Sequence, residues 1–205
     1  MHVTAEQNAR RFFDTYVNNK TGDFLEIGSY LSSFNIRSLA PKGSNYVGVD
    51  LGSGPGVDVV LTDPYKLPFE DDSFDFVISS SCFEHSEFFW LTYMEVMRVL
   101  KPSGLFYLNA PSNGDFHRFP VDCWRFFPDS GNALSNWSRR NGMNTAVVEQ
   151  YTSNNGNDIW SDYISIFIKD IDTIGLYPNR ITTNFNDYTN GSIFPHEILL
   201  NKKLW

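Results

Sequence analysis

The 205-residue sequence lacks the features that mark membrane, secreted and nucleic-acid-binding proteins. No apolar run approaches the roughly 20 residues that a helix needs to cross a bilayer, and the polar first 20 residues lack the apolar stretch of a secretory signal. No run of Lys and Arg is longer than two, and the net charge is -8, whereas a phosphate backbone attracts a basic surface. We therefore expect a cytoplasmic protein that binds neither nucleic acid nor a membrane surface.

Cysteine and histidine are also scarce. Cys82 and Cys123 could form one bridge, but two thiols in a chain of this size are more typical of a reducing compartment. Of the four histidines, His2 and His196 lie outside every motif, and the acids at 70–72 fall in an exposed context. The sequence offers no convincing cluster of metal ligands, so we expect no metal.

Aromatic residues, by contrast, make up 16% of the chain and supply large buried area for a single core. Short apolar runs alternate with segments of helical periodicity, which predicts a mostly parallel sheet covered on both faces. The expected strands are 24–27, 46–49, 57–61, 74–79, 105–109 and, at about these bounds, 145–151 and 162–169. The expected helices are 4–19, 31–40, 86–100 and about 130–141.

The last part of the chain has a different character from the rest. From Ile171 onward, Asn, Thr and isolated aromatic residues follow one another without clean periodicity. We expect residues 1–170 to form one domain. Residues 171–205 are expected to form an extended C-terminal extension that packs on this domain, or on a second subunit of a homodimer.

A glycine and an acid at the ends of two expected strands are the most informative pair. The apolar run at 24–27 ends at Gly28, and the run at 46–49 ends at Asp50, 22 positions later. In a doubly wound sheet, such a glycine lets the backbone approach a ligand, and such an acid accepts hydrogen bonds from ribose hydroxyls. The pair therefore predicts that the chain binds a cofactor of nucleoside type.

An ordered set of motifs between Phe24 and about Ser112 resembles class I S-adenosylmethionine-dependent methyltransferases of the methyltransferase type 11 kind. The motifs are Leu25-Glu26-Ile27-Gly28, Val47-Gly48-Val49-Asp50, Asp63 with Leu67-Pro68-Phe69, Asp72 to Val77, Phe83-Glu84-His85, and Glu95 to Leu105. The resemblance implies an α/β, Rossmann-like three-layer sandwich with a mostly parallel, seven-stranded sheet, which is the class I methyltransferase fold. It also implies an enzyme that uses S-adenosylmethionine and releases S-adenosylhomocysteine.

The resemblance further implies where the cofactor binds. Asp50 would accept the ribose hydroxyls, Asp63 would accept the adenine amino group, and Leu51 would lie against the adenine face. The expected cofactor-binding residues are Glu26, Gly28, Ser29, Tyr30, Asp50, Leu51, Asp63, Pro64 and Ser80. The family usually has glycine two and four residues after Gly28, where this chain has Tyr30 and Ser32. Pro64 also removes one N–H that could bind adenine.

The segment 115–128 is the second candidate site. It follows the last strand of the motif region, at the edge where open α/β sheets bind ligands. Its Pro-Val-Asp-x-Trp-Arg-Phe stretch resembles methyltransferases found with glycan and cell-surface polysaccharide biosynthesis. The expected substrate-binding residues are His117, Arg118, Asp122, Trp124 and Arg125. Alternatively, Trp124, Phe126 and Phe127 belong to the core, and Asp122 and Arg125 form a structural ion pair.

These motifs lead to a functional hypothesis. We expect O-methylation of a small-molecule or glycan acceptor, although N- and C-methylation remain open. A sugar hydroxyl is a poor nucleophile, and an imidazole can take its proton near neutral pH. His117 and His85 are the candidate catalytic residues, with His117 preferred. A non-catalytic binding or scaffold protein on the same fold is the main alternative, and a nicotinamide dehydrogenase is disfavoured by the glycine spacing.

Overall fold

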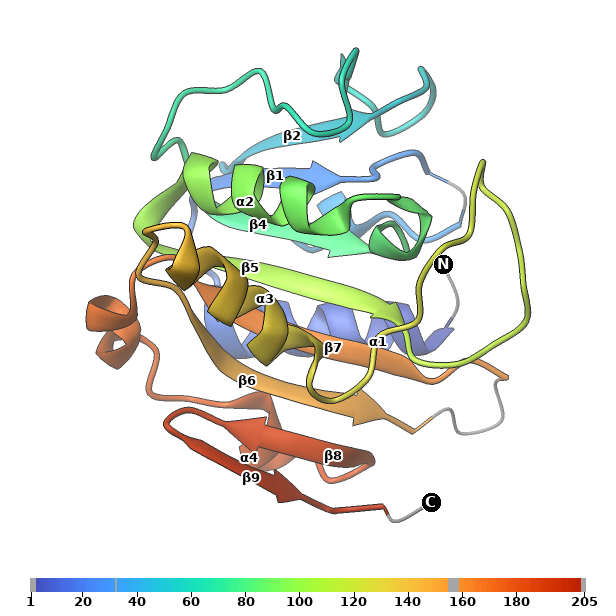
Figure 1. Cartoon of the computed structure of the whole chain (residues 1–205). Helices are drawn as coiled ribbons and strands as arrows, with labels where there is room; N and C mark the ends of the chain where they lie inside the picture. The colour runs from blue at the N-terminus through green and yellow to red at the C-terminus, as the bar shows by residue number, and fades with distance from the viewer. Residues whose placement is uncertain (1–2, 32, 155–158, 204–205) are drawn as a thin grey trace.

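The computed structural model of the protein describes residues 3–31, 33–154 and 159–203. Within these ranges, nine strands form one sheet in the order β3-β2-β1-β4-β5-β7-β6-β8-β9 (Figure 1). The strands are β1 (Asp23–Ile27), β2 (Asn45–Asp50), β3 (Val59–Val60), β4 (Phe74–Ser80), β5 (Leu100–Pro111), β6 (Ala146–Ser153), β7 (Asp162–Ile168), β8 (Tyr188–Ile193) and β9 (His196–Leu200).

Helices cover both faces of the sheet, so the fold has three layers. Figure 1 shows α2 and α3 on one face and α1 on the other. Buried Tyr93 and Met97 of α2 belong to one apolar core, and buried Phe12 of α1 belongs to a second core. The helical elements are α1 (Val3–Phe12), η1 (Phe13–Val17), η2 (Ile36–Leu39), η3 (Phe83–His85), α2 (Phe89–Val99), α3 (Ser130–Arg140), η4 (Ile171–Leu176) and α4 (Ile181–Asn184).

The order of the strands creates a switch point beside Gly28. Strands β3, β2, β1, β4 and β5 are parallel to one another, so their carboxyl ends share one edge of the sheet. The chain leaves β1 toward β2 and β3 on one side and then crosses to β4 on the other. Open α/β sheets bind ligands outside the strand ends at such a point.

The expected fold class is confirmed, but the sheet has nine strands rather than seven. The additional strands β8 and β9 come from the C-terminal extension, where we expected no regular elements. Strand β8 pairs with β6 through backbone hydrogen bonds, which require no apolar periodicity in the sequence. The helix expected at 31–40 was also wrong, because the described residues of this range form only the single 3-10 turn Ile36–Leu39.

A buried carboxylate joins the C-terminal extension to the body. Glu149 on β6 accepts hydrogen bonds from the Ile181 N–H at 2.7 Å, from the Thr182 N–H at 3.1 Å and from the Thr182 hydroxyl at 2.8 Å. The hydroxyl of Tyr16 on η1 also donates to it. Four donors around one carboxylate compensate its removal from water, so this contact fixes α4 against β6.

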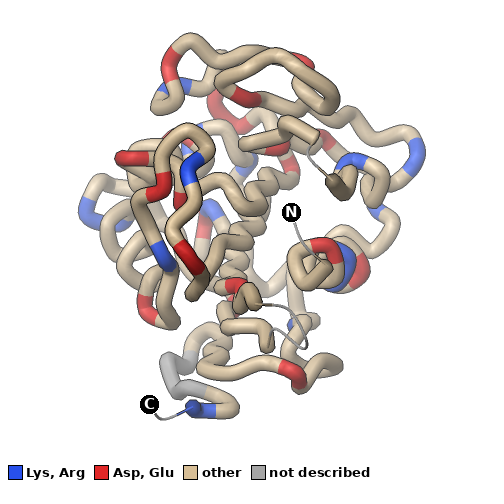
Figure 2. Tube along the Cα trace, turned by 90° about the vertical axis from the view of Figure 1, so that its right-hand side faces the viewer, with Lys and Arg blue, Asp and Glu red and all other residues tan. Residues whose placement is uncertain are grey.

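Basic positions stand singly or in pairs among acidic ones on the side of the molecule seen in Figure 2. Among the described residues, no helix is both long and apolar enough to cross a membrane. Both cysteines are free thiols.

Candidate functional site

A cavity of about 1050 Å³ lies at the carboxyl ends of β1, β2 and β4. It brings together residues that lie far apart in the sequence. The sequence-predicted residues that line it are Glu26, Gly28, Ser29, Tyr30, Asp50, Leu51, Pro64, Ser80, His85, His117 and Arg118. The predicted residues Asp63, Asp122, Trp124 and Arg125 are not among its lining residues.

Gly28 ends β1 in a conformation that requires glycine. Its φ is 77°, and a Cβ at this position would lie 2.6 Å from both Cβ and Sγ of Cys82. Its N–H donates to the Val49 carbonyl at 3.0 Å. Because the ends of β1 and β4 approach so closely, only a residue without a side chain fits between them.

Asp50 is held in place by the backbone of two loops. Its Oδ2 accepts from the Tyr30 N–H at 3.0 Å, and its Oδ1 accepts from the Leu51 N–H at 2.7 Å. Oδ1 also accepts from the Gly52 N–H at 3.4 Å, which leaves the second lone pair of Oδ2 available. The carboxylate is therefore held in a fixed orientation at the cavity and can still accept a hydrogen bond from a ligand hydroxyl.

The ring of Tyr30 lies against the neighbouring loop 52–56. A Cβ on Gly54 would clash with the Tyr30 ring, and a Cβ on Gly56, whose φ is 88°, would clash with the Ser29 carbonyl. The loop after β1 therefore lacks the family's usual glycines, whereas the neighbouring loop 52–56 has Gly54 and Gly56. These two glycines leave space for Tyr30 and Ser29. Ser32, the other replaced glycine, lies outside the described residues.

Polar groups near the end of β1 are buried around the cavity. Glu26 accepts a hydrogen bond from the Tyr46 hydroxyl at 2.8 Å, and burial raises its pKa to about 7 against the opposing effect of this bond. The hydroxyls of Ser29 and Ser80 are buried, and neither has a hydrogen-bond partner among the described residues. These hydroxyls are available to a polar ligand.

Asp63 has a local partner in the structure. Its Oδ1 accepts from the Tyr65 N–H at 2.8 Å, as in a turn that begins with an acid. Pro64 and Tyr65, which follow it, line the cavity. Tyr65 was not predicted from the sequence, where an isolated Tyr in a loop carries no distinguishing pattern.

The segment after β5 is fixed by an ion pair. Both carboxylate oxygens of Asp122 accept from the Arg125 guanidinium, at 2.6 and 2.9 Å, and this contact holds the pKa of Asp122 well below its usual range. The Asp122 carboxylate also accepts a hydrogen bond from the backbone N–H of His117 at 2.7 Å. The Trp124 indole N–H donates to the Ser86 carbonyl at 2.9 Å. These three side chains hold the segment, while His117 and Arg118 face the cavity.

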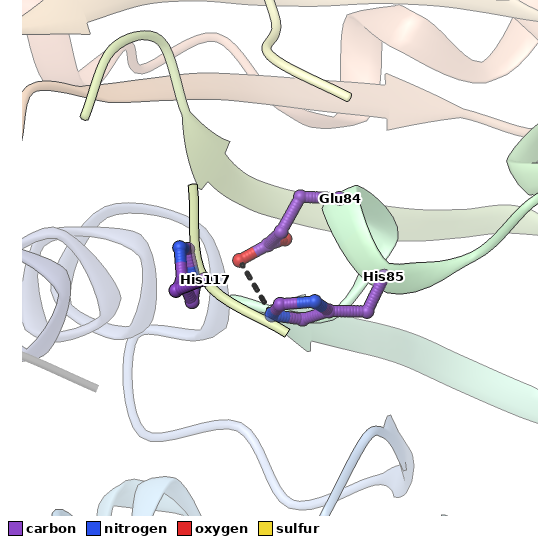
Figure 3. A group of neighbouring side chains, drawn as sticks. All are labelled: Glu84, His85 and His117. Atoms are coloured by element: carbon purple, nitrogen blue, oxygen red, sulfur yellow. Dashed lines mark ion pairs between the residues drawn. The ribbon is translucent and has the colours of Figure 1, made fainter. Parts of the chain in front are cut away.

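The two histidines differ in their surroundings (Figure 3). Nδ1 of His85 lies 2.5 Å from the Val121 carbonyl oxygen, its Nε2 lies 3.7 Å from Oε1 of Glu84, and burial lowers its pKa. Nδ1 of His117 lies 3.1 Å from the Asp115 carbonyl and 3.5 Å from the Asp122 carboxylate. The side chain of His117 is 41% exposed. Glu84, by contrast, is buried, and this burial raises the pKa of its carboxyl group to about 8.

Comparison with known proteins supports the motif assignment. Residues 25–108 match the family model described as a methyltransferase domain. The chain is 34% identical over 106 residues to phthiotriol/phenolphthiotriol dimycocerosates methyltransferase of Mycobacterium tuberculosis, an alignment that covers 44% of this chain. The chain spans 37% of the length of that relative. The resemblance to type 11 methyltransferases is therefore confirmed over the region that carries the motifs.

Solved structures confirm the fold. The 1,6-didemethyltoxoflavin-N1-methyltransferase of Burkholderia thailandensis, solved with S-adenosylhomocysteine bound, has a TM-score of 0.62 at 14% identity and covers 81% of this chain and 78% of its own. The [4+2]-cyclase SpnF has the same TM-score at 10% identity and covers 81% and 82%. The chain thus has the class I methyltransferase fold, on which more than one reaction is catalysed.

Proposed function

We propose that the chain is an S-adenosylmethionine-dependent methyltransferase that methylates a hydroxyl of a small acceptor, such as a sugar or a glycan intermediate. One observation carries the proposal. A single cavity connects the fixed carboxylate of Asp50 to the imidazole of His117. Such a cavity has room for a nucleoside cofactor at one end and an acceptor at the other, in the arrangement that methyl transfer requires.

The cofactor half of the cavity fits S-adenosylmethionine. Asp50 accepts the ribose hydroxyls, the exposed Leu51 side chain lies against the adenine ring, and the buried hydroxyls of Ser29 and Ser80 bind polar groups of the methionine part. When bound, the cofactor supplies an electrophilic methyl group on a sulfonium. The role of Asp63 in binding adenine remains a prediction. Its carboxylate would have to accept from the adenine amino group in addition to the Tyr65 N–H.

In the acceptor half, we propose His117 as the residue that accepts the proton. Nδ1 of His85 donates to Val121 and its Nε2 faces Glu84, so both of its nitrogens are directed at protein atoms. In the neutral His117 ring, Nδ1 donates to Asp115, which leaves Nε2 free to accept a proton from a hydroxyl. Asp122 accepts from the backbone N–H of His117 at 2.7 Å and so holds this residue in position.

The wall around His117 supports a hydroxylated acceptor with an apolar face. Arg118, Phe119 and Trp160 line the cavity beside it. A guanidinium can bind oxygen atoms, and flat rings can pack on the apolar face of a sugar. The name of the mycobacterial relative gives phthiotriol/phenolphthiotriol dimycocerosates as its acceptor, and the glycan class proposed here rests on the resemblance of the segment 120–126.

A non-catalytic scaffold is the competing proposal. It was motivated by Tyr30, which could have filled the cofactor half of the site. The contact between the Tyr30 ring and Gly54 favours catalysis instead, because the ring lies over the neighbouring loop while the cavity beside it stays open.

Calorimetric titration with S-adenosylhomocysteine tests the cofactor half. We expect saturable binding, weakened about tenfold or more in Asp50→Ala, because a charged hydrogen bond contributes about 1.5–3 kcal/mol. Asp63→Ala is the matched comparison, and equal losses in both variants would extend the site to Asp63. Absence of binding to the wild-type protein would refute the cofactor.

Methyl transfer to a panel of acceptors tests the second half. The panel contains free sugars, nucleotide sugars and amines, each incubated with S-adenosylmethionine carrying a labelled methyl group. We expect methyl ethers by NMR, and turnover lowered in His117→Ala far more than S-adenosylhomocysteine affinity. Products methylated only at nitrogen, or unchanged turnover in His117→Ala, would contradict O-methylation or the role of His117, respectively.

A further inference from the structure

A cluster of three side chains stands at the acceptor end of the cavity. Glu84, His85 and His117 each offer one ligand atom, and these three atoms lie within 4.8 Å of one another. All three residues line the cavity. Figure 3 shows the Glu84 carboxylate directed toward the imidazole of His85, with the His117 ring on the other side of the carboxylate.

The Glu84 carboxylate is an independent sign of a missing partner. Glu84 is 1% exposed, and its Oε2 has no hydrogen-bond partner in the part of the chain that the structure describes. A buried carboxylate oxygen without a donor is unfavourable. A bound cation would supply the compensation that the protein itself does not.

The contacts of both imidazoles are those of metal ligands. Metal-bound histidines usually donate their second ring N–H to a carbonyl or carboxylate, which leaves the other nitrogen for the ion. Nδ1 of His85 contacts the Val121 carbonyl, and Nδ1 of His117 contacts the Asp115 carbonyl and lies near Asp122. Both rings are therefore held as the tautomer whose Nε2 carries a lone pair.

We propose that Glu84, His85 and His117 form a binding site for a divalent transition-metal ion of the Zn²⁺ type. Two imidazoles and one carboxylate suit such ions, whereas Mg²⁺ and Ca²⁺ prefer oxygen ligands. At bond lengths of about 2.0–2.2 Å, tetrahedral ligand atoms are about 3.4 Å apart. The Glu84–His85 distance of 3.7 Å nearly meets this value, and the half-exposed His117 side chain would approach to complete the site.

The fourth coordination position would open into the cavity. Nε2 of His117 has a single lone pair, which cannot bind a metal ion and a proton at the same time. His117 can therefore act as a base only in the metal-free protein. The metal site itself does not depend on methyl transfer, and its test is therefore a binding measurement.

Titration of tag-free, chelator-treated protein with Co²⁺, followed by visible absorption and then by competition with Zn²⁺, tests the site. We expect one ion per chain and the band intensities of a four- or five-coordinate ion. Glu84→Gln and His117→Ala are each expected to weaken binding by about tenfold or more. His196→Ala on β9 and Cys123→Ser are controls that should bind as the wild type does.

Three outcomes would overturn the proposal. They are the absence of stoichiometric binding, equal affinity in the cluster variants and the controls, and a thiolate-to-cobalt charge-transfer band that vanishes in Cys123→Ser. If a cluster variant fails to fold by circular dichroism, X-ray absorption of the Zn²⁺-loaded wild-type protein decides the case. Imidazole scattering with only nitrogen and oxygen ligands is the expected result, and a sulfur ligand would refute it.

Discussion

Replacement of Gly28 by alanine tests the geometry at the floor of the cavity. The added Cβ would lie 2.6 Å from Cβ and Sγ of Cys82, and the residue would have to keep a φ of 77°. The left-handed conformation costs about 1–2 kcal/mol for a residue with a side chain, and forced overpacking costs about 1–3 kcal/mol. We therefore expect Gly28→Ala to lower the free energy of unfolding by about 2–5 kcal/mol.

The chain offers controls that separate these two costs. Gly142 has a φ of 87°, and a Cβ added there would have no neighbouring atom within 4 Å. Gly43 has a φ of 92°, and the atom nearest to an added Cβ would be Thr21 Cγ2 at 3.9 Å. Gly142→Ala and Gly43→Ala should therefore lose only the conformational part, about 1–2 kcal/mol.

Urea denaturation followed by circular dichroism measures all three variants under the same conditions. The difference between Gly28→Ala and the two controls is the steric cost of pushing β1 and β4 apart, expected at about 1–3 kcal/mol. If Gly28→Ala is no less stable than the controls, the ends of β1 and β4 do not approach as described, and the reasoning about this position fails.

Three further perturbations test other parts of the molecule. Glu149→Gln should lower the free energy of unfolding by about 2–4 kcal/mol, because an amide replaces the carboxylate acceptor among four donors; Glu70→Gln, at an exposed position, is its control, and equal midpoints in urea would contradict this role. Burial raises the pKa of Glu26 from 4.5 to about 7. Between these pH values the folded protein keeps a proton that the unfolded chain releases. The free energy of unfolding should therefore fall by on the order of 3 kcal/mol as the pH rises from 4.5 to 7. In urea denaturation measured across that pH range, the free energy of unfolding of Glu26→Gln should not show this fall. Asp122→Asn should lower turnover on the order of 10–100-fold, since it releases the segment that orients His117, and a parallel loss of S-adenosylhomocysteine affinity would show a wider structural effect instead.

The cofactor half of the site could be predicted from the sequence because its signals are local. Gly28 and Asp50 each end an apolar run, and the parallel arrangement of such strands brings their ends to one edge. The position of Tyr30 could not be predicted in the same way. It depends on a contact with Gly54, which lies on another loop and becomes a neighbour only after folding.

The acceptor half was harder to predict because its contacts are long-range. Residue type identified His85 and His117 as candidates, but their 32-residue separation gave no sign that they meet across the buried Glu84. Glu84 itself was noted only as part of the motif Phe83-Glu84-His85. Asp122, Trp124 and Arg125 carry the residue types of a binding site, yet in the structure they bind one another and the backbone.

The strands of the C-terminal extension were missed for a related reason. Period-two alternation arises only when one face of a strand meets water and the other meets the core. In strand β8 the three consecutive residues Asn190, Gly191 and Ser192 are buried, so buried positions fall on both faces. Its sequence therefore shows neither the alternation nor the continuous apolar run by which strands are identified.

The Asp122–Arg125 pair has an evolutionary consequence. It anchors one end of the segment after β5, while β5 anchors the other, and the residues between them, including Arg118 and Phe119, form one wall of the cavity. Substitutions at these wall positions change what the cavity accepts without altering the strands that carry Gly28 and Asp50. If the chain methylates an acceptor as proposed, a few adjacent substitutions in this wall would therefore change the acceptor while Gly28 and Asp50 keep their positions.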